Sequence, residues 1–121
     1  MRLLMCDAQT GLLRALYALA EKALPDVRAC PHAMVVETQK MENWASITFN
    51  GHRHHIALRL GGAQARQQKL AQALEEGVGR LAWRMSGHYL VDALVTSLHE
   101  EEDTEGRVTR MVIEAVTLVE D

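Results

Sequence analysis

The stretch WASITFNGHRHHIALRL, residues 44–60, decides the fold that this sequence predicts. Its centre is the dipeptide Asn50-Gly51, which suits the positive backbone φ angles of a two-residue type I′ turn. On either side of it, apolar and polar side chains alternate as they do in half-buried strands. A turn at this dipeptide predicts the cross-strand pairs Phe49 with His52, Ile47 with His54, Ala45 with Ile56, and Glu42 with Arg59. We therefore expect an antiparallel hairpin with strands at residues 44–49 and 52–60.

The sequence before this hairpin predicts one helix and one further strand. Apolar residues recur at helical spacing over residues 10–24, and Pro25 ends the run. Residues 33–39 alternate apolar and polar side chains, which is typical of a strand. Residues 40–43 are expected to turn the chain from this strand into the hairpin.

The sequence after the hairpin predicts a second helix and a long C-terminal pair of strands. The helix covers residues 63–78, and its core-facing stripe is expected to be Gln67, Leu70, Ala71, Leu74 and Val78. The strands cover residues 88–98 and 107–119. The predicted order is α-β-β-β-α-β-β in a single α+β domain, residues 1–121. Two helices would cover one face of a mostly antiparallel sheet of about five strands, a two-layer sandwich.

The two C-terminal strands are apolar on both of their faces. An antiparallel sheet that is covered on one side normally carries polar residues on its free side, and two helices can cover only one side. The second side is therefore predicted to meet a partner or another copy of the chain. The residues expected at this interface are Tyr89, Val91, Ala93, Val95, Val112, Val116 and Leu118. The alternative is that surface valines are scattered there because they favour strands.

Composition and charge exclude some classes of function. The chain of 121 residues has 13 Lys and Arg against 16 Asp and Glu, a formal net charge of −3. This balance argues against general binding to nucleic acid, which needs a positive field. No run approaches the roughly 18 apolar residues that span a membrane, so a cytoplasmic location is expected. Cys6 and Cys30 lie far apart and are both expected to be reduced. No cofactor is predicted.

The histidines are the first candidates for chemistry. His52 and His54 share one face of a strand by alternation, and two imidazoles at this spacing can bind zinc, nickel or copper. A metal site needs a third ligand, which only His32, His88 or His99 could supply through tertiary contacts. Histidines that are partly buried at the tip of a hairpin are the favoured interpretation.

Other candidate groups point to chemistry less specifically. Acidic residues 100–105 form the tip of the last hairpin, where a solvated, mobile loop is expected. Cys30 and His32 could bring a thiol near an imidazole, but no other part of a nucleophilic site accompanies them. Ser86 does not lie in the G-x-S-x-G motif of a nucleophile elbow.

Two segments resemble a small bacterial family of hypothetical proteins of about this length: residues 44–54 and residues 86–92. This resemblance implies no activity, cofactor or catalytic residue. The order of helix, strands, helix and long C-terminal hairpin is also similar to that of phage tail-terminator proteins, which assemble as rings. This second resemblance implies a structural role in a phage-like particle.

The sequence thus favours a non-enzymatic assembly or binding module that self-associates through its C-terminal hairpin. Two alternatives stay open beside the phage-tail-like role. One is a metal-binding protein or enzyme that uses His52 and His54. The other is a small-molecule pocket between the helices and the sheet, for which the sequence indicates no specific residue.

Overall fold

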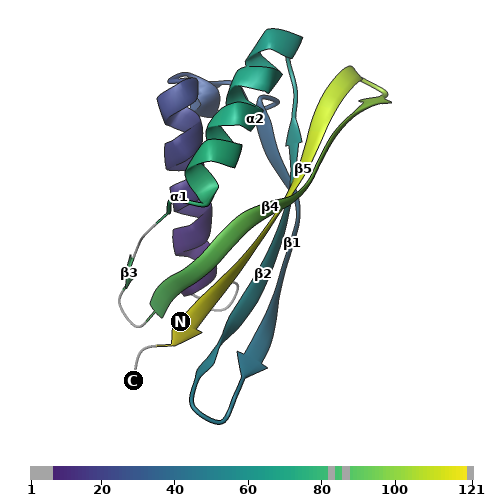
Figure 1. Ribbon diagram of the computed structural model, residues 1–121. Coiled ribbons are helices and arrows are strands. Elements are labelled where there is room, and N and C mark those ends of the chain that lie inside the picture. The colour runs from purple at the N-terminus through teal and green to yellow at the C-terminus, as the bar shows by residue number, and fades with distance from the viewer. Residues whose placement is uncertain (1–6, 82–83, 86–87, 120–121) are drawn as a thin grey trace.

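Two helices lie side by side against one face of an antiparallel sheet (Figure 1). The computed structural model describes residues 7–81, 84–85 and 88–119; Cys6 and Ser86 lie outside these ranges. The elements are α1 (Asp7–Ala23), the short 3-10 helix η1 (Val27–Ala29), β1 (Met34–Ala45), β2 (Asn50–Leu60), α2 (Gln64–Val78), β3 (Arg84–Met85), β4 (His88–Asp103) and β5 (Gly106–Val119). Four long strands and the two-residue β3 are arranged in the order β1-β2-β5-β4-β3.

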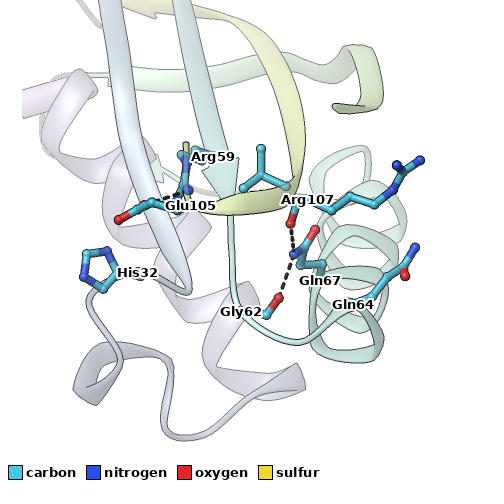
Figure 2. Close-up of a pocket in the computed structure, with 8 residues that line it drawn as sticks. His32, Arg59, Gly62, Gln64, Gln67, Glu105 and Arg107 are labelled. Carbon is cyan, nitrogen blue, oxygen red and sulfur yellow. Dashed lines mark hydrogen bonds and ion pairs between the residues drawn. The ribbon is translucent and has the colours of Figure 1, made fainter. Parts of the chain in front are cut away.

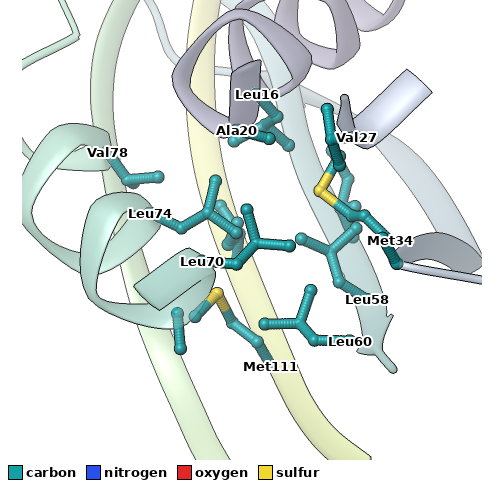
Figure 3. Packing of buried hydrophobic residues seen from close by; sticks show 14 of the residues in the cluster. Leu16, Ala20, Val27, Met34, Leu58, Leu60, Leu70, Leu74, Val78 and Met111 are labelled. Atoms are coloured by element: carbon teal, nitrogen blue, oxygen red, sulfur yellow. The ribbon is translucent and has the colours of Figure 1, made fainter. Parts of the chain in front are cut away.

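The core lies between the helices and the two central strands, β2 and β5. Leu58 and Met111 pair across these strands and point toward Leu70 and Leu74 of α2 (Figure 3). From α1, Leu12, Leu16 and Ala20 complete this layer. The residues that α2 buries are Gln67, Leu70, Ala71, Leu74 and Val78. The α+β class, the helices on one face and the predicted stripe of α2 are thus confirmed.

The predicted position of the first hairpin turn is wrong. Asn50 and Gly51 lie inside β2, where Asn50 pairs with Ala45, and the turn covers residues 46–49. Ser46 closes this turn: its N–H donates to the Phe49 carbonyl at 2.8 Å. Its Oγ accepts hydrogen bonds from the N–H groups of Thr48 at 3.3 Å and Phe49 at 3.1 Å. A side chain of this kind can hold a turn without glycine.

Gly51 serves a different purpose from the predicted one. A Cβ at this position would lie 2.0 Å from the Thr117 carbonyl oxygen of β5, far inside van der Waals contact. Glycine is therefore needed because the backbones of β2 and β5 approach closely here. The dipeptide that suggested a turn instead marks the close approach of β2 to β5.

The predicted turn at residues 40–43 is also absent, so two strands precede α2 and not three. Within β1, Lys40 pairs with His55 and Glu42 with Arg53 across the ladder to β2. β1 lies at the edge of the sheet, where charged side chains are common, so Lys40 and Glu42 did not require a turn. The predicted order of elements is corrected to α-β-β-α-β-β-β, in which β3 has only two residues.

The C-terminal hairpin is longer than predicted. β4 runs to Asp103 and β5 starts at Gly106, whose φ of 114° favours glycine at the turn. The ladder between them shifts register twice, between Leu90 and Asp92 and between Val95 and Ser97. Each shift is a bulge, and each reverses the alternation of side chains between the two faces.

Candidate functional site

The face of the sheet opposite the helices is the main candidate for a functional surface, and we call it the outer face. On β5, Met111, Ile113 and Ala115 are buried toward the helices. The residues of β5 between and beyond them therefore point to the outer face: Val112, Glu114, Val116 and Leu118. The neighbouring residues of β2 on this face are Arg53, His55 and Ala57. Those of β4 are Tyr89, Asp92, Leu94 and Ser97.

The residues predicted for an interface divide between the two faces. Tyr89, Val112, Val116 and Leu118 lie in rows of the outer face, and Val91 is 56% exposed at a bulge. Ala93 is buried in the core, and Val95 packs against it. The two bulges of β4 explain this division, because simple alternation from Tyr89 ignores the residue that each bulge adds. Leu94, which that counting excluded, is 45% exposed beside Glu114.

A hollow of about 200 Å³ opens on the outer face. Its lining residues are Arg53, Asp92, Leu94, Thr96, Glu114, Ala115 and Val116. Leu94 and Val116 give it apolar surface, while one basic and two acidic side chains surround them. An apolar centre with a polar rim is the usual composition of a protein contact surface.

A second exposed apolar group lies at the β1–β2 turn. Ile47 is fully exposed and Phe49 is 53% exposed. The turn projects beyond the rest of the sheet (Figure 1). Isolated surface apolar residues are common, but two large ones on a single projecting turn are a candidate contact.

The histidines meet on the helix-facing side of the sheet. The ring centroid of His52 lies 6.1 Å from that of His54 and 5.9 Å from that of His88. His54 is buried, donates from Nδ1 to Gln9 Oε1 and accepts at Nε2 from the Thr117 hydroxyl at 2.8 Å. Burial lowers the pKa of His54 to about 4, with smaller contributions from the two neighbouring rings.

These contacts make His54 a structural residue, since both of its ring nitrogens are bonded within the chain. Burial also lowers the pKa of His52, helped by the nearby His88. His32 lies elsewhere, in a pocket beside α2, and His99 lies 3.4 Å from Glu101 on β4. Within residues 7–81, 84–85 and 88–119, no group of three or more His, Cys, Asp or Glu side chains is arranged to hold a metal ion.

The acidic tip of the C-terminal hairpin, which was expected to be a solvated, mobile loop, is mostly exposed and is also contacted by arginines. Arg59 of β2 donates from Nε to Asp103 and from Nη2 to Glu105, both at 2.9 Å. Arg110 contacts Glu37 at 3.1 Å and also Glu101. The hydrogen bond from Arg59 holds the pKa of Asp103 below its usual range. Sequence reasoning missed these pairs because the residues come from four different strands and the β4–β5 turn.

A pocket of about 430 Å³ lies where this tip meets the start of α2 (Figure 2). Gln67 crosses its base and donates to the carbonyls of Gly62 at 2.8 Å and Arg107 at 2.7 Å. Arg59 and Arg107 are paired with Glu105 and Glu100. The polar groups of the pocket are thus used to join α2 to the hairpin, which indicates a structural role.

Cys30 and His32 both line a smaller adjoining pocket of about 230 Å³. The Cys30 thiol donates to Asp26 Oδ2 at 3.7 Å, a weak contact with a carboxylate and not with an imidazole. The Cys30 thiol is therefore not hydrogen-bonded to the His32 imidazole, the contact that a cysteine nucleophile with a histidine base would use.

No protein-family model and no curated protein matches this chain. A solved structure described as "Virion of native gene transfer agent (GTA) particle" contains a chain of similar fold, with a TM-score of 0.68 and 16% sequence identity. The alignment covers 93% of this chain and 99% of that chain. At this identity the likeness establishes the shared fold. Among the described residues, no helix is long and apolar enough to cross a membrane.

Proposed function

We propose that this chain is a non-enzymatic structural subunit that self-associates in a phage-like particle, with the outer face of its sheet as the contact surface. The observation that carries the proposal is the uncovered apolar surface around Leu94 and Val116. The helices of the chain pack on the opposite face (Figure 1). Apolar surface that a chain's own elements leave uncovered can be covered in an assembly.

The shared fold supports the particle context. The similar chain belongs to a virion, which is an assembly of many chains, and nearly the whole of both chains takes part in the alignment. The order of elements had already suggested a phage tail-terminator-like subunit that forms rings. A subunit of this type needs contact surfaces and no catalytic group.

The charges on the outer face favour a second protein copy over a polyanion. Arg53 lies on the same hollow as Asp92 and Glu114. The two carboxylates would repel the phosphates of a nucleic acid or an anionic lipid. Another copy of this chain offers both signs of charge, so it can complement the hollow.

The proposal is tested by adding a charge at Leu94. Leu94→Lys places an ammonium group beside Glu114 on the neighbouring strand, so the folded chain should tolerate it. In an assembly the same charge would be buried, and self-association should weaken roughly tenfold or more. Sedimentation equilibrium over a range of concentrations measures this effect.

The matched control is Ala18→Lys, which adds the same charge at an exposed position of α1. Circular dichroism should show that both variants fold. The control should associate as the unmodified chain does. A monomeric mass for the unmodified chain at high micromolar concentration would contradict the proposal.

A further inference from the structure

We infer that the hollow on the outer face receives the β1–β2 turn of the next copy, so that subunits join head to tail through Ile47 and Phe49. This inference rests on the proposed self-association and specifies its geometry. We call the Ile47 and Phe49 side chains the knob, and the hollow lined by Arg53, Asp92, Leu94, Thr96, Glu114, Ala115 and Val116 the socket.

The distribution of exposed large apolar residues gives the first argument. Within the described parts of the chain, two of them, Ile47 and Phe49, lie on the β1–β2 turn. Tyr89 and Leu94 lie on the outer face, with Val91 at a bulge beside them. The others, Met41, Leu98 and Val119, lie in rows that face the helices. In the sheet, β2 and β5 separate β1 from β4. The knob and the outer-face residues Tyr89 and Leu94 therefore lie on different strands of one copy, and a head-to-tail contact covers both.

The knob is a preformed projection. Ser46 fixes the turn with the hydrogen bonds described above, and no residue other than glycine has a positive φ in the described chain. The turn extends past the end of the sheet (Figure 1), while the socket lies on the sheet's outer surface. A fixed turn loses little conformational freedom on binding, which favours its use as a contact.

The socket suits a side chain more than an added strand. Its volume of about 200 Å³ and its Leu94 and Val116 surface fit one large apolar side chain. The bulges near Val91 and Thr96 interrupt the edge of β4. Bulges on an edge strand disfavour pairing with another strand, so the partner is expected to insert side chains and not to extend the sheet.

Symmetry provides the last argument. If two outer faces met each other, the same patch would be used twice and the assembly would close as a dimer. Such a dimer does not require the knob. A contact between two different surfaces continues from copy to copy and forms a ring where its rotation closes. The knob and the socket are two such surfaces.

Disulfide trapping between copies tests the inference. The background carries Cys6→Ser and Cys30→Ser, and single variants carry either Ile47→Cys or Leu94→Cys. Under mild oxidation, a mixture of the two single variants should give a covalent dimer, and neither should do so alone. A double variant with both cysteines should give a ladder of covalent oligomers on a non-reducing gel.

Each other outcome has a definite meaning. If Leu94→Cys alone forms dimers and the mixture forms no mixed product, outer faces meet each other and the head-to-tail inference is overturned, while self-association stands. If the unmodified chain is oligomeric but no pair is trapped, the inference is again overturned. If the unmodified chain is monomeric, the proposed function itself fails.

A charge on the knob gives an independent measurement. Ile47→Asp should weaken self-association roughly tenfold to a hundredfold, because a large apolar side chain no longer enters the socket. Ile47 is fully exposed in the single chain, so thermal unfolding of the dilute variant should be unchanged. Thr48→Asp adds the same charge at the neighbouring exposed position and should have a much smaller effect. Equal effects of the two variants would argue against the knob.

Discussion

Among single residues, His54 was a candidate metal ligand but has a structural role, because both of its ring nitrogens are bonded within the chain. Its two nitrogens bond to Gln9 of α1 and Thr117 of β5, so the imidazole joins a helix to the centre of the sheet. Gln9 in turn donates to Gln39 of β1 at 3.0 Å. A buried imidazole with both nitrogens bonded avoids the cost of an unsatisfied polar group. The neutral ring is required, because a second ring proton would remove the acceptor for Thr117.

This requirement makes stability depend on pH. The pKa of His54 is about 4 in the folded chain against 6.5 as the ordinary value. The unfolded chain therefore binds more protons between these two values, and stability that is complete above pH 6.5 is lost as the pH falls toward 4. His54 should lower the free energy of unfolding by about 2 kcal/mol between pH 7 and pH 5. Urea unfolding at the two pH values measures this loss.

His54→Gln keeps a hydrogen-bonding side chain but cannot titrate, so its loss of stability over this range should be smaller. His55→Gln is the matched control, because His55 points to the outer face of the same strand. His52 and His88, the charged or titratable groups nearest to His54, remain in both variants. An unchanged pH slope in His54→Gln would show that other groups cause the acid sensitivity.

Among elements, the β4–β5 hairpin depends on Arg59 for the position of its tip. The Arg59 side chain is 9% exposed and joins β2 to Asp103 and Glu105. Arg59→Gln should release the tip, and amide hydrogen exchange should become roughly tenfold or more faster over residues 100–108. Amides of Met111 and Ile113, in the core ladder, should keep their protection. Arg66→Gln removes the exposed ion pair with Asp26 and should leave the tip unchanged.

The sequence was informative where an element's own pattern determines its structure. The stripe of α2 could be predicted because helical periodicity depends only on residues of that helix. The turn at residues 46–49 could not, since the Asn50-Gly51 signal was local while the need for Gly51 comes from Thr117 on β5. Strand partners that are distant in sequence override turn propensity in this way.

The candidate site could be predicted only in part: the strands that carry it were identified, but several of its residues were not. The helices cover only one face of the C-terminal strands, as expected, but the two-sided apolar character holds only in part, because the outer face of β4 carries Asp92 and Ser97 beside Tyr89 and Leu94. The residues on each face could not be counted through the bulges of β4, so Ala93 and Val95 were placed on the outer face and Leu94 was not. The knob was missed because the mistaken hairpin put Ile47 in a strand opposite His54.

For the whole molecule, we expect self-association to be coupled to the unfolding equilibrium, so that association raises the stability of the folded chain. The single chain exposes apolar residues in the knob and the socket that burial between copies would remove from water. Association that involves only folded chains shifts the unfolding equilibrium by mass action. The melting temperature of the unmodified chain should therefore rise with protein concentration, by roughly 5 °C or more over a hundredfold range. Differential scanning calorimetry at both ends of that range measures the shift.

The variants separate this linkage from non-specific effects of concentration. Leu94→Lys changes the socket and Ile47→Asp changes the knob, so each should melt at a temperature that is independent of concentration. Ala18→Lys, on the helix layer, should retain the rise. A rise that survives in both interface variants would place the stabilising contact elsewhere on the molecule. A rise lost in Leu94→Lys but kept in Ile47→Asp would mean that the socket is covered by a surface other than the turn, because only the knob variant leaves the socket intact.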